Sequence, residues 1–305
     1  PKSLISYTDS PSAKAAFDQT CDFFEHARNG DGTNVTFLLD EALDIKIFES
    51  FPGLRDARRK FWRTLCESPN KFVLTTRFIT RSLRLFRDAS EQFEFVFMPP
   101  LTVAEAMRVT TELNLGKTKK ERLELSHIVH ALTDGRPHYL KLLAEGTAAL
   151  GGDDPVSALT TQLAPGAPIS MACRFSYELR LHRARGYGAL RGILRILSLE
   201  APLTLTEVAR RLSRTPGSTK DYLSWLEDVD LIEVKQKRYQ FADPMLRLWV
   251  NLHGQATPPD VDDLTRGVRD YARVSAFPDV ESAAELDAKL GDLKPLLLFQ
   301  TGACV

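Results

Sequence analysis

The sequence has few cysteines, no long apolar run and no excess of charge of either sign. Its four cysteines lie far apart and form no CxxC pair, which argues against a zinc knuckle and against disulfides: Cys21, Cys66, Cys173 and Cys304. No apolar stretch approaches the roughly 20 residues that span a bilayer, and no signal-peptide pattern opens the chain. We therefore expect a reduced, cytoplasmic protein without a membrane partner.

The charge balance and the length of the chain restrict the possible classes of protein further. The 40 basic and 40 acidic side chains cancel, so no global field favours nucleic acid or a membrane surface as a partner. The six histidines are scattered, and neither a metal-ligand cluster nor a Ser-His-Asp set stands out. A chain of 305 residues that is 43% hydrophobic can bury more than one core, so we expect two or three domains.

The most informative stretch is 35–41, an apolar run that ends in two adjacent carboxylates. A run this short and this apolar predicts a strand buried on both faces of a parallel sheet. Asp40 and Glu41 would then lie at the rim of that sheet, where open α/β folds bind ligands. One carboxylate there can hold a hydrated Mg²⁺, and a second can orient a water for attack on a phosphate. An ordinary buried strand followed by an acidic turn is the structural alternative.

Strand and helix patterns alternate through the first third of the chain. Further strands are predicted over 71–77 and 93–97, with helical stretches near 54–66 and 81–86. Such alternation is typical of a parallel α/β sheet. We therefore expect residues 1–98 to form an α/β core.

The remainder is predicted to be mostly helical. Residues 99–152 carry apolar side chains at helical spacing, and Gly/Pro-rich segments that resemble linkers follow at 151–155 and 165–168. Over 165–252, three helices and then a two-strand ribbon at 231–241 predict a winged helix-turn-helix. Residues 253–305 form a C-terminal segment that is helical in parts and has no assignable role.

Taken together, these segments resemble the STAND and archaeal-type AAA+ ATPases. These are P-loop NTPases of the ASCE type, in which an ATPase core is followed by a helical lid and a winged helix. The resemblance covers roughly residues 1–252. Residues 35–41 resemble the Walker B strand, which implies that Asp40 holds Mg²⁺ through water and that Glu41 polarises the attacking water.

Two further motifs carry the resemblance. Residues 71–77 resemble the sensor-1 strand, which in the STAND branch ends in Thr-Thr-Arg, as it does here. This implies that Thr76 lies at the cofactor and that Arg77 reaches the γ-phosphate bidentately, although a solvated arginine at a helix start is the alternative. Residues 133–140 resemble the lid's Gly-x-Pro motif, which implies that Gly135 and Pro137 lie near the adenine. A helix C-cap glycine followed by a helix-opening proline is equally compatible with that motif.

The chain departs from the family at the phosphate loop. No GxxxxGK[ST] precedes Asp40, so we do not expect the chain as given to bind ATP tightly. The sequence Gly116-Lys117-Thr118 does not qualify, because Thr111 stands where the loop needs glycine. Because the start looks cut, we interpret the chain as the C-terminal portion of a longer ATPase. Its strands would keep exposed edges, so we expect the isolated fragment to be poorly soluble.

The predicted winged helix is a weak candidate for DNA binding. Lys220 on the presumptive recognition helix has acidic neighbours, which make a poor face for phosphates. Lys235, Lys237 and Arg238 at the predicted wing are the other candidate contacts, and a solvated basic face is the usual explanation of such a cluster. In STAND proteins this domain often docks on the core and reports nucleotide state, and we favour that role.

Two functional hypotheses follow. The first is the C-terminal portion of a switch ATPase that uses ATP and Mg²⁺, the fragment itself being inactive, with a protein partner or a second copy of the chain. Arg81, Arg84 and Arg87 have the spacing of a finger offered to a neighbouring subunit, although a solvated face explains them as well. The second is a winged-helix DNA-binding regulator with a non-catalytic α/β scaffold. A pure interaction module, such as a defence signalling component, is a third class that the sequence does not test.

Overall fold

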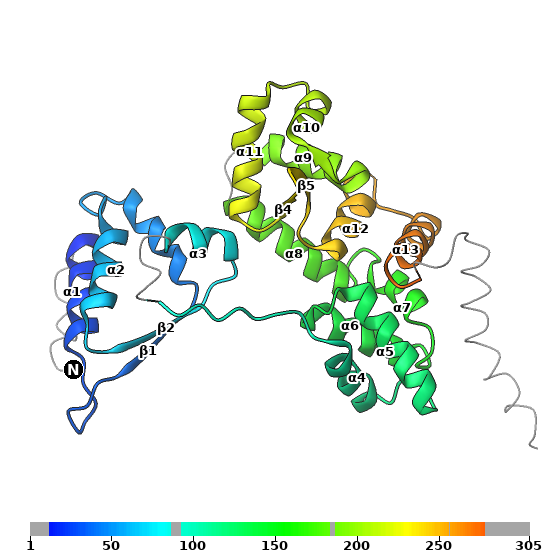
Figure 1. Cartoon of the computed structure of the whole chain (residues 1–305), viewed down its shortest axis with the longest axis horizontal. Coiled ribbons are helices and arrows are strands. Elements are labelled where there is room, and N and C mark those ends of the chain that lie inside the picture. The colour runs from blue at the N-terminus through cyan, green and yellow to red at the C-terminus, as the bar shows by residue number, and fades with distance from the viewer. Residues whose placement is uncertain (1–11, 87–92, 184–186, 256, 278–305) are drawn as a thin grey trace, which may run out of the picture. The chain divides into compact units, whose positions relative to one another are not determined.

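The computed structural model describes residues 12–86, 93–183, 187–255 and 257–277. The chain divides into two compact units, Pro1–Phe95 and Val96–Val305, and each is described by itself (Figure 1). Within the described part of the chain, no helix is both long enough and apolar enough to cross a membrane.

The first unit is a small α/β arrangement built on two strands. Strands β1 and β2 are parallel and pair Thr36 with Lys71 through to Leu39 with Leu74, which confirms the predicted parallel sheet. In chain order its elements are α1 (Ala13–His26), β1 (Thr36–Leu39), the 3₁₀ segment η2 (Ala42–Ser50), α2 (Ala57–Glu67), β2 (Lys71–Leu74) and α3 (Ile79–Leu85).

The core of this unit lies on one face of the sheet. Figure 1 shows α1 and α2 on the same side of the two strands, and Phe24 of α1 packs edge-on against Phe37 and Phe72, with ring centroids 4.9 and 5.7 Å away. Leu38 and Val73 point to the other face and are 77% and 50% exposed. The prediction of strands buried on both faces is therefore wrong for this unit, because both covering helices pack on a single face.

The predicted third strand is not formed. Residues 93–100 adopt neither strand nor helix, although Phe93 and Phe95 pack their rings on Phe86, with centroids 4.7 and 5.9 Å away. A strand needs a neighbour for its backbone groups, and in the described part of this unit the sheet ends at β1 and β2. The apolar alternation at 93–97 thus serves ring packing rather than strand pairing.

The second unit is mainly helical. Three of its helices begin with a capping box in which a threonine and a glutamate satisfy each other's backbone amides: Thr102 with Glu105, Thr118 with Glu121, and Thr204 with Glu207. Its first helices are α4 (Val103–Glu112), α5 (Lys119–Thr133), α6 (Pro137–Ala149), α7 (Pro155–Gln162) and α8 (Pro168–Arg183). The Gly/Pro-rich segments at 151–155 and 165–168 flank α7, whose Val156 and Leu159 are buried.

A three-helix and three-strand module follows within the same unit. It comprises α9 (Tyr187–Glu200), β3 (Leu203–Thr204), α10 (Leu205–Arg211), α11 (Pro216–Asp228), β4 (Ile232–Lys235) and β5 (Arg238–Phe241). The sheet is antiparallel, in the order β3-β5-β4, so the predicted two-strand ribbon gains a short third strand. The hairpin turn between β4 and β5 places Gln236 and Lys237 at positive φ, 51° and 63°, as tight hairpins require.

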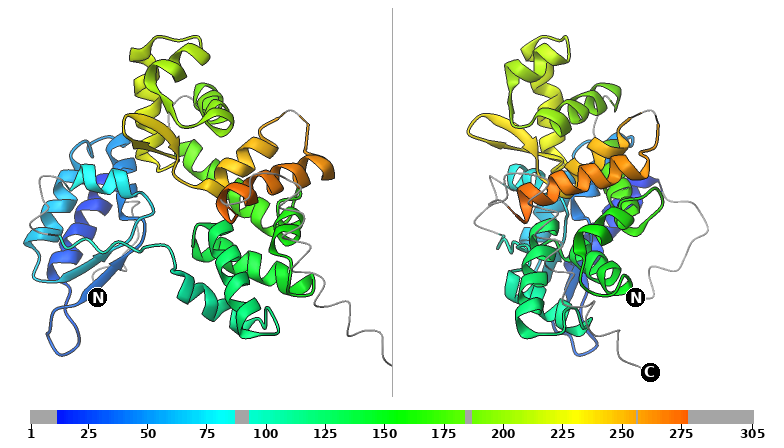
Figure 2. Two further views of the ribbon diagram at one scale, coloured as in Figure 1. Left: turned by 45° about the vertical axis from the view of Figure 1, so that its right-hand side comes forward. Right: turned by 90° about the vertical axis from the view of Figure 1, so that its right-hand side faces the viewer.

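Two last helices join this module to the earlier ones. Helix α12 (Pro244–His253) packs on α8, α9 and α5, while α13 (Val261–Ser275) packs on α7, α5 and α12 (Figure 2). The Tyr271 hydroxyl of α13 donates a hydrogen bond of 2.9 Å to the Leu132 carbonyl of α5. The described part of the predicted C-terminal segment therefore packs against helices of the predicted lid.

Candidate functional site

Asp40 and Glu41 directly follow β1, at the carboxyl end of the sheet. The strand pairing continues past β1, because the Ala42 amide donates to the Thr75 carbonyl at 3.2 Å. Glu41 has a left-handed backbone, with φ 49° and ψ 41°, which turns the chain from the strand into η2. For a residue other than glycine this conformation costs roughly 1–2 kcal/mol, and such local strain is frequent at functional sites.

Each carboxylate of the pair is bonded to a residue that follows the neighbouring strand. The Thr75 hydroxyl donates to Asp40 Oδ1, and Arg77 Nε donates to Glu41 Oε1. The Glu41 side chain is 17% exposed and that of Arg77 is 52% exposed. Because parallel strands end at the same edge of a sheet, the two strand ends form one site of two acids, one hydroxyl and one guanidinium.

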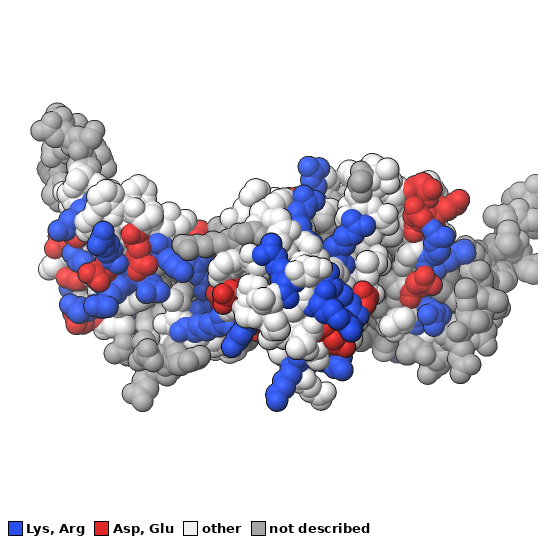
Figure 3. Space-filling model, turned by 90° about the horizontal axis from the view of Figure 1, so that it is seen from above, with Lys and Arg blue, Asp and Glu red and all other residues white. Residues whose placement is uncertain are grey.

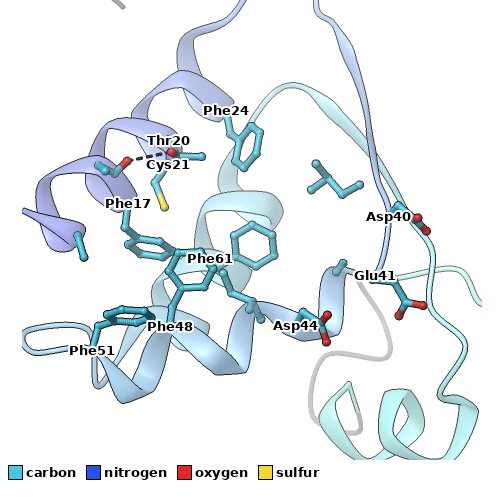
Figure 4. Close-up of a pocket in the computed structure, with 15 residues that line it drawn as sticks. Phe17, Thr20, Cys21, Phe24, Asp40, Glu41, Asp44, Phe48, Phe51 and Phe61 are labelled. Carbon is cyan, nitrogen blue, oxygen red and sulfur yellow. Dashed lines mark hydrogen bonds between the residues drawn. The ribbon is translucent and has the colours of Figure 1, made fainter. Parts of the chain in front are cut away.

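An apolar cavity of about 420 Å³ lies beside this site. Phenylalanine rings from α1, η2 and α2 line it, and Asp40 and Glu41 stand at its rim. In Figure 4 both carboxylates turn away from the rings of Phe17, Phe48 and Phe61. The carboxylates at the end of β1 therefore point away from the apolar cavity.

The residues at the strand ends suit Mg²⁺ but not a whole triphosphate. Glu41 Oε2 is buried and accepts no hydrogen bond from any described residue, so this carboxylate has an oxygen left over for a ligand once the site opens. The described residues include no group of three or more metal-ligating side chains, which is compatible with Mg²⁺ because that ion usually takes one or two carboxylates and fills the rest with water and phosphate. The phosphate donors seen here, Thr75 and Arg77, already engage the carboxylates.

The two threonines after β2 have different roles. The predicted site residue Thr76 accepts a hydrogen bond of 3.1 Å from the Phe78 amide at the start of α3. Thr75, which was not predicted, contacts Asp40. The register could have revealed it, since Leu39 pairs with Leu74 and the residues that follow must then be neighbours.

The Gly-Lys-Thr segment begins a helix. Thr118 is the N-cap of α5, and the Glu121 carboxylate accepts from the amides of Lys117 and Thr118 at 2.8 and 3.1 Å. This carboxylate occupies the helix N-terminus, where a phosphate would have to bind. Gly116 has φ 69°, and a Cβ there would lie 2.9 Å from the Arg122 nitrogen. The segment is a tight turn with a capped helix.

The Gly-x-Pro segment is a helix-to-helix turn in the second unit. Asp134 and Gly135 both have a left-handed backbone after α5, with φ 53° and 62°, and Pro137 is the first residue of α6. A Cβ at Gly135 would overlap the Leu101 carbonyl oxygen, so the turn requires glycine. The capping interpretation is thus confirmed, and the nucleotide contact of Gly135 and Pro137 stays a prediction.

The candidate DNA contacts lie around the β4–β5 hairpin and on α11. Lys235 pairs with Glu233 at 2.6 Å and Arg238 with Glu207 at 3.7 Å, while Lys220 and Lys237 are exposed. Figure 3 views the side that carries α10 and α11 and shows basic and acidic side chains interspersed. Two of the four cations are therefore already neutralised by carboxylates within the module.

Of the arginines predicted as a finger, Arg81 donates to the Leu43 carbonyl at 3.4 Å, and Arg87 lies outside the described residues.

Comparison with known proteins supports the fold. No known protein family matches the sequence, and no curated protein does either. Among solved structures, the chain is similar to the Walker-type ATPase PABY2304 of Pyrococcus abyssi, with a TM-score of 0.56 and 19% identity over 79% of this chain and 68% of that one. The chain therefore has a P-loop ATPase-like fold, with a partial parallel sheet in its first unit.

Proposed function

We propose that this chain is part of a nucleotide-driven switch ATPase of the STAND or AAA+ type. The observation that carries the proposal is the acidic pair at the end of β1, where Thr75 and Arg77, which follow the adjacent parallel strand β2, hold Asp40 and Glu41. The likeness of the fold to a Walker-type ATPase supports it. In this proposal the helices over 99–152 act as a lid and the module over 165–252 as a winged helix that reports nucleotide state.

In this proposal each site residue has a separate role in ATP hydrolysis. Mg²⁺, when bound with ATP, would polarise the phosphoryl oxygens. Asp40 would hold the waters of that ion, with its orientation fixed by the Thr75 hydroxyl. Glu41, whose Oε1 is held by Arg77, would polarise the attacking water. The Arg77 side chain is half-exposed, and its terminal nitrogens would bind phosphate oxygens.

We further propose that the phosphate-binding loop of this ATPase lies outside these 305 residues. The exposed Leu38 and Val73, on the uncovered face of the two-stranded sheet, support an incomplete core. On this view the chain as given binds ATP weakly and is poorly soluble. A monodisperse sample of the 305 residues that melts cooperatively in its first unit would contradict that part of the proposal.

Turnover of the protein extended upstream to its native start tests the proposed chemistry. Glu41→Gln should retain ATP binding and lose hydrolysis by about 10²-fold or more, because the amide is a far weaker base than the carboxylate. Asp40→Asn should weaken Mg²⁺-dependent ATP binding instead. Glu67→Gln, on the exposed end of α2 in the same unit, is the matched control and should change neither. Unchanged turnover in Glu41→Gln would remove that residue from the mechanism.

A DNA-binding regulator is the second candidate. The exposed Lys220 and Lys237 favour it, whereas the ion pairs of Lys235 and Arg238 weaken it. It predicts duplex binding that weakens as salt rises and that Lys237→Ala reduces. Failure to bind any duplex at low salt would overturn it.

A further inference from the structure

A buried polar cluster joins the Gly-x-Pro turn to the end of β5 and the start of α12. Its members come from α6, α8 and the β5–α12 junction, which pack together in the second unit (Figure 1). Arg136 Nη2 donates to the Ala242 carbonyl at 2.6 Å, and its Nε lies 3.7 Å from Asp243 Oδ1. The Tyr139 hydroxyl donates to Asp243 Oδ2 at 3.3 Å. One carboxylate thus receives groups from both the turn and the first turn of α6.

Asp243 is the centre of this cluster. It is only 4% exposed, and its Oδ1 also accepts from the Leu246 amide at 3.1 Å as the N-cap of α12. A buried carboxylate is tolerated only when it is paired and hydrogen-bonded. Arg136 and Tyr139 therefore cannot withdraw from Asp243 without leaving its charge less compensated.

Burial keeps the Tyr139 hydroxyl and the neighbouring Cys173 thiol protonated. Burial, followed by the Asp243 charge, raises the pKa of Tyr139 well above its ordinary value, so its hydroxyl remains a donor. Burial likewise raises the pKa of Cys173 to about 12, and this thiol lies 3.5 Å from the Tyr139 hydroxyl. Tyr139 and Cys173 therefore both remain hydrogen-bond donors at neutral pH.

The other end of the turn is held just as closely. The Leu101 amide donates to the Gly135 carbonyl at 2.7 Å, and His130 Nε2 donates to the Leu101 carbonyl at 2.7 Å. Leu101 directly precedes the N-cap of α4. Gly135 is thus fixed to the segment that leads into the lid, and Arg136, the next residue, is fixed to the β5–α12 junction.

We propose that Arg136 and Asp243 form a joint through which the Gly135–Pro137 turn and the β3–β5 module move together. Asp243 is then a positioning residue that sets Pro137 by holding Arg136 and Tyr139. Arg136 also lies 3.9 Å from Asp134, whose side chain is 53% exposed, against 6% for Asp243. A solvated carboxylate beside a buried one gives Arg136 an alternative partner whenever the turn shifts. The coupling to nucleotide rests on the proposed function; the joint itself does not.

Hydrogen exchange of the 305-residue chain without nucleotide tests the joint. Asp243→Asn keeps an N-cap acceptor for α12 but removes the charge that holds Arg136. We expect amide exchange in 136–143 to accelerate by about tenfold. In the reciprocal variant, Arg136→Ala, exchange in 241–250 should accelerate comparably. Glu112→Gln, on the exposed end of α4 in the same unit, is the matched control and should leave both segments unchanged.

The outcomes separate a joint from a local structural role. Acceleration confined to the element that carries each substitution would overturn the proposal. Arg136→Lys keeps the charge but loses the fork that reaches Ala242 and Asp243 together, so it should restore part of the protection; no restoration would also count against the joint. If Asp243→Asn fails to fold, Tyr139→Phe and Arg136→Lys still test the joint from the side of the turn, because both should accelerate exchange in 241–250; exchange there that stays unchanged in both variants would overturn the proposal.

A second arm adds Mg²⁺ and ATP to the protein extended upstream. Nucleotide should alter exchange in β4 and β5 of the wild type, and Arg136→Ala should abolish that response while the protein still binds ATP. No response in the wild type would contradict the proposed switch but leave the ligand-free test of the joint intact. A response that persists in Arg136→Ala would overturn the joint as the route of coupling.

Discussion

The two units of this molecule differ in how completely they bury their apolar and polar groups. In the first unit, Leu38 and Val73 on the uncovered face of the two-stranded sheet are 77% and 50% exposed, and Asp40 at the sheet edge is exposed as well. In the second unit, Leu140 and Leu143 are fully buried, and the carboxylate of Asp243 is nearly so. The first unit therefore leaves one face of its sheet exposed, whereas the second unit buries both apolar side chains and a hydrogen-bonded carboxylate.

The largest expected effect comes from truncating leucines in the two units. Leu143→Ala should lower the free energy of unfolding of the second unit by about 2–5 kcal/mol, since it leaves a cavity in a close-packed core. Leu38→Ala should change the stability of the first unit by less than about 0.5 kcal/mol. Denaturant titration followed by tryptophan fluorescence, with Trp62→Phe used to isolate the second unit, measures the difference. Equal losses would contradict the comparison.

Breaking the two arginine–carboxylate pairs sharpens the contrast. Arg136→Ala should destabilise the second unit by about 2 kcal/mol, because Asp243 keeps its charge in a buried site and Arg136 itself is about a third exposed. Arg77→Ala should cost the first unit about 1 kcal/mol or less, because solvent screens the half-exposed Arg77 side of this pair, although Glu41 is only 17% exposed. Thermal melts of both variants against wild type report the two values. A larger loss for Arg77→Ala would show that the strand-end pair is structural.

Thiol accessibility offers a smaller test of the same contrast. Cys66 on α2 is exposed, whereas Cys173 is buried and its pKa is raised to about 12. In a Cys304→Ser background, native protein should expose Cys66 to a thiol reagent at pH 8 and protect Cys173. Mass spectrometry of the labelled peptides identifies which site reacts. Rapid labelling of Cys173 in native protein would mean that the second unit opens readily.

The smallest expected effect is a pH dependence in the second unit. Burial lowers the pKa of His253, whose Nε2 donates to the Leu163 carbonyl at 2.9 Å. The unfolded chain then binds more protons than the folded one at acidic pH, so this histidine's contribution to stability is present above its ordinary pKa of 6.5 and is lost as pH falls below it. His253→Gln should flatten the stability profile between pH 7 and 5, by less than about 1 kcal/mol. An unchanged slope would assign the dependence to other groups.

The sequence predicts the parallel strand pair because short apolar runs ending in polar residues are strong local signals. It also predicts the helices of the second unit, where three capping boxes mark helix starts. The third strand over 93–97 fails because strand formation depends on a neighbour that local pattern does not report. Likewise, Leu38 and Val73 are apolar residue types that are usually buried, and only the placement of α1 and α2 shows which face of the sheet is covered.

The residues of the candidate site likewise fall into those that local sequence predicts and those that depend on tertiary placement. Asp40, Glu41 and Arg77 are found by their position after apolar runs, and the structure brings them to one edge. Thr75 was missed because its contact depends on strand register rather than on sequence. The cluster around Asp243 was missed because its partners are remote: Tyr139 and Asp243 are 104 residues apart, and neither residue type signals a buried contact in its local context.

Mg²⁺-dependent ATP binding by the 305-residue chain and by the protein extended upstream to its native start tests the central claim most directly. The account predicts tight binding by the extended protein, weak binding by the 305 residues, and loss of Mg²⁺ dependence in Asp40→Asn. Binding by neither form would contradict it and would reduce the acidic pair at the end of β1 to a structural feature of the sheet edge.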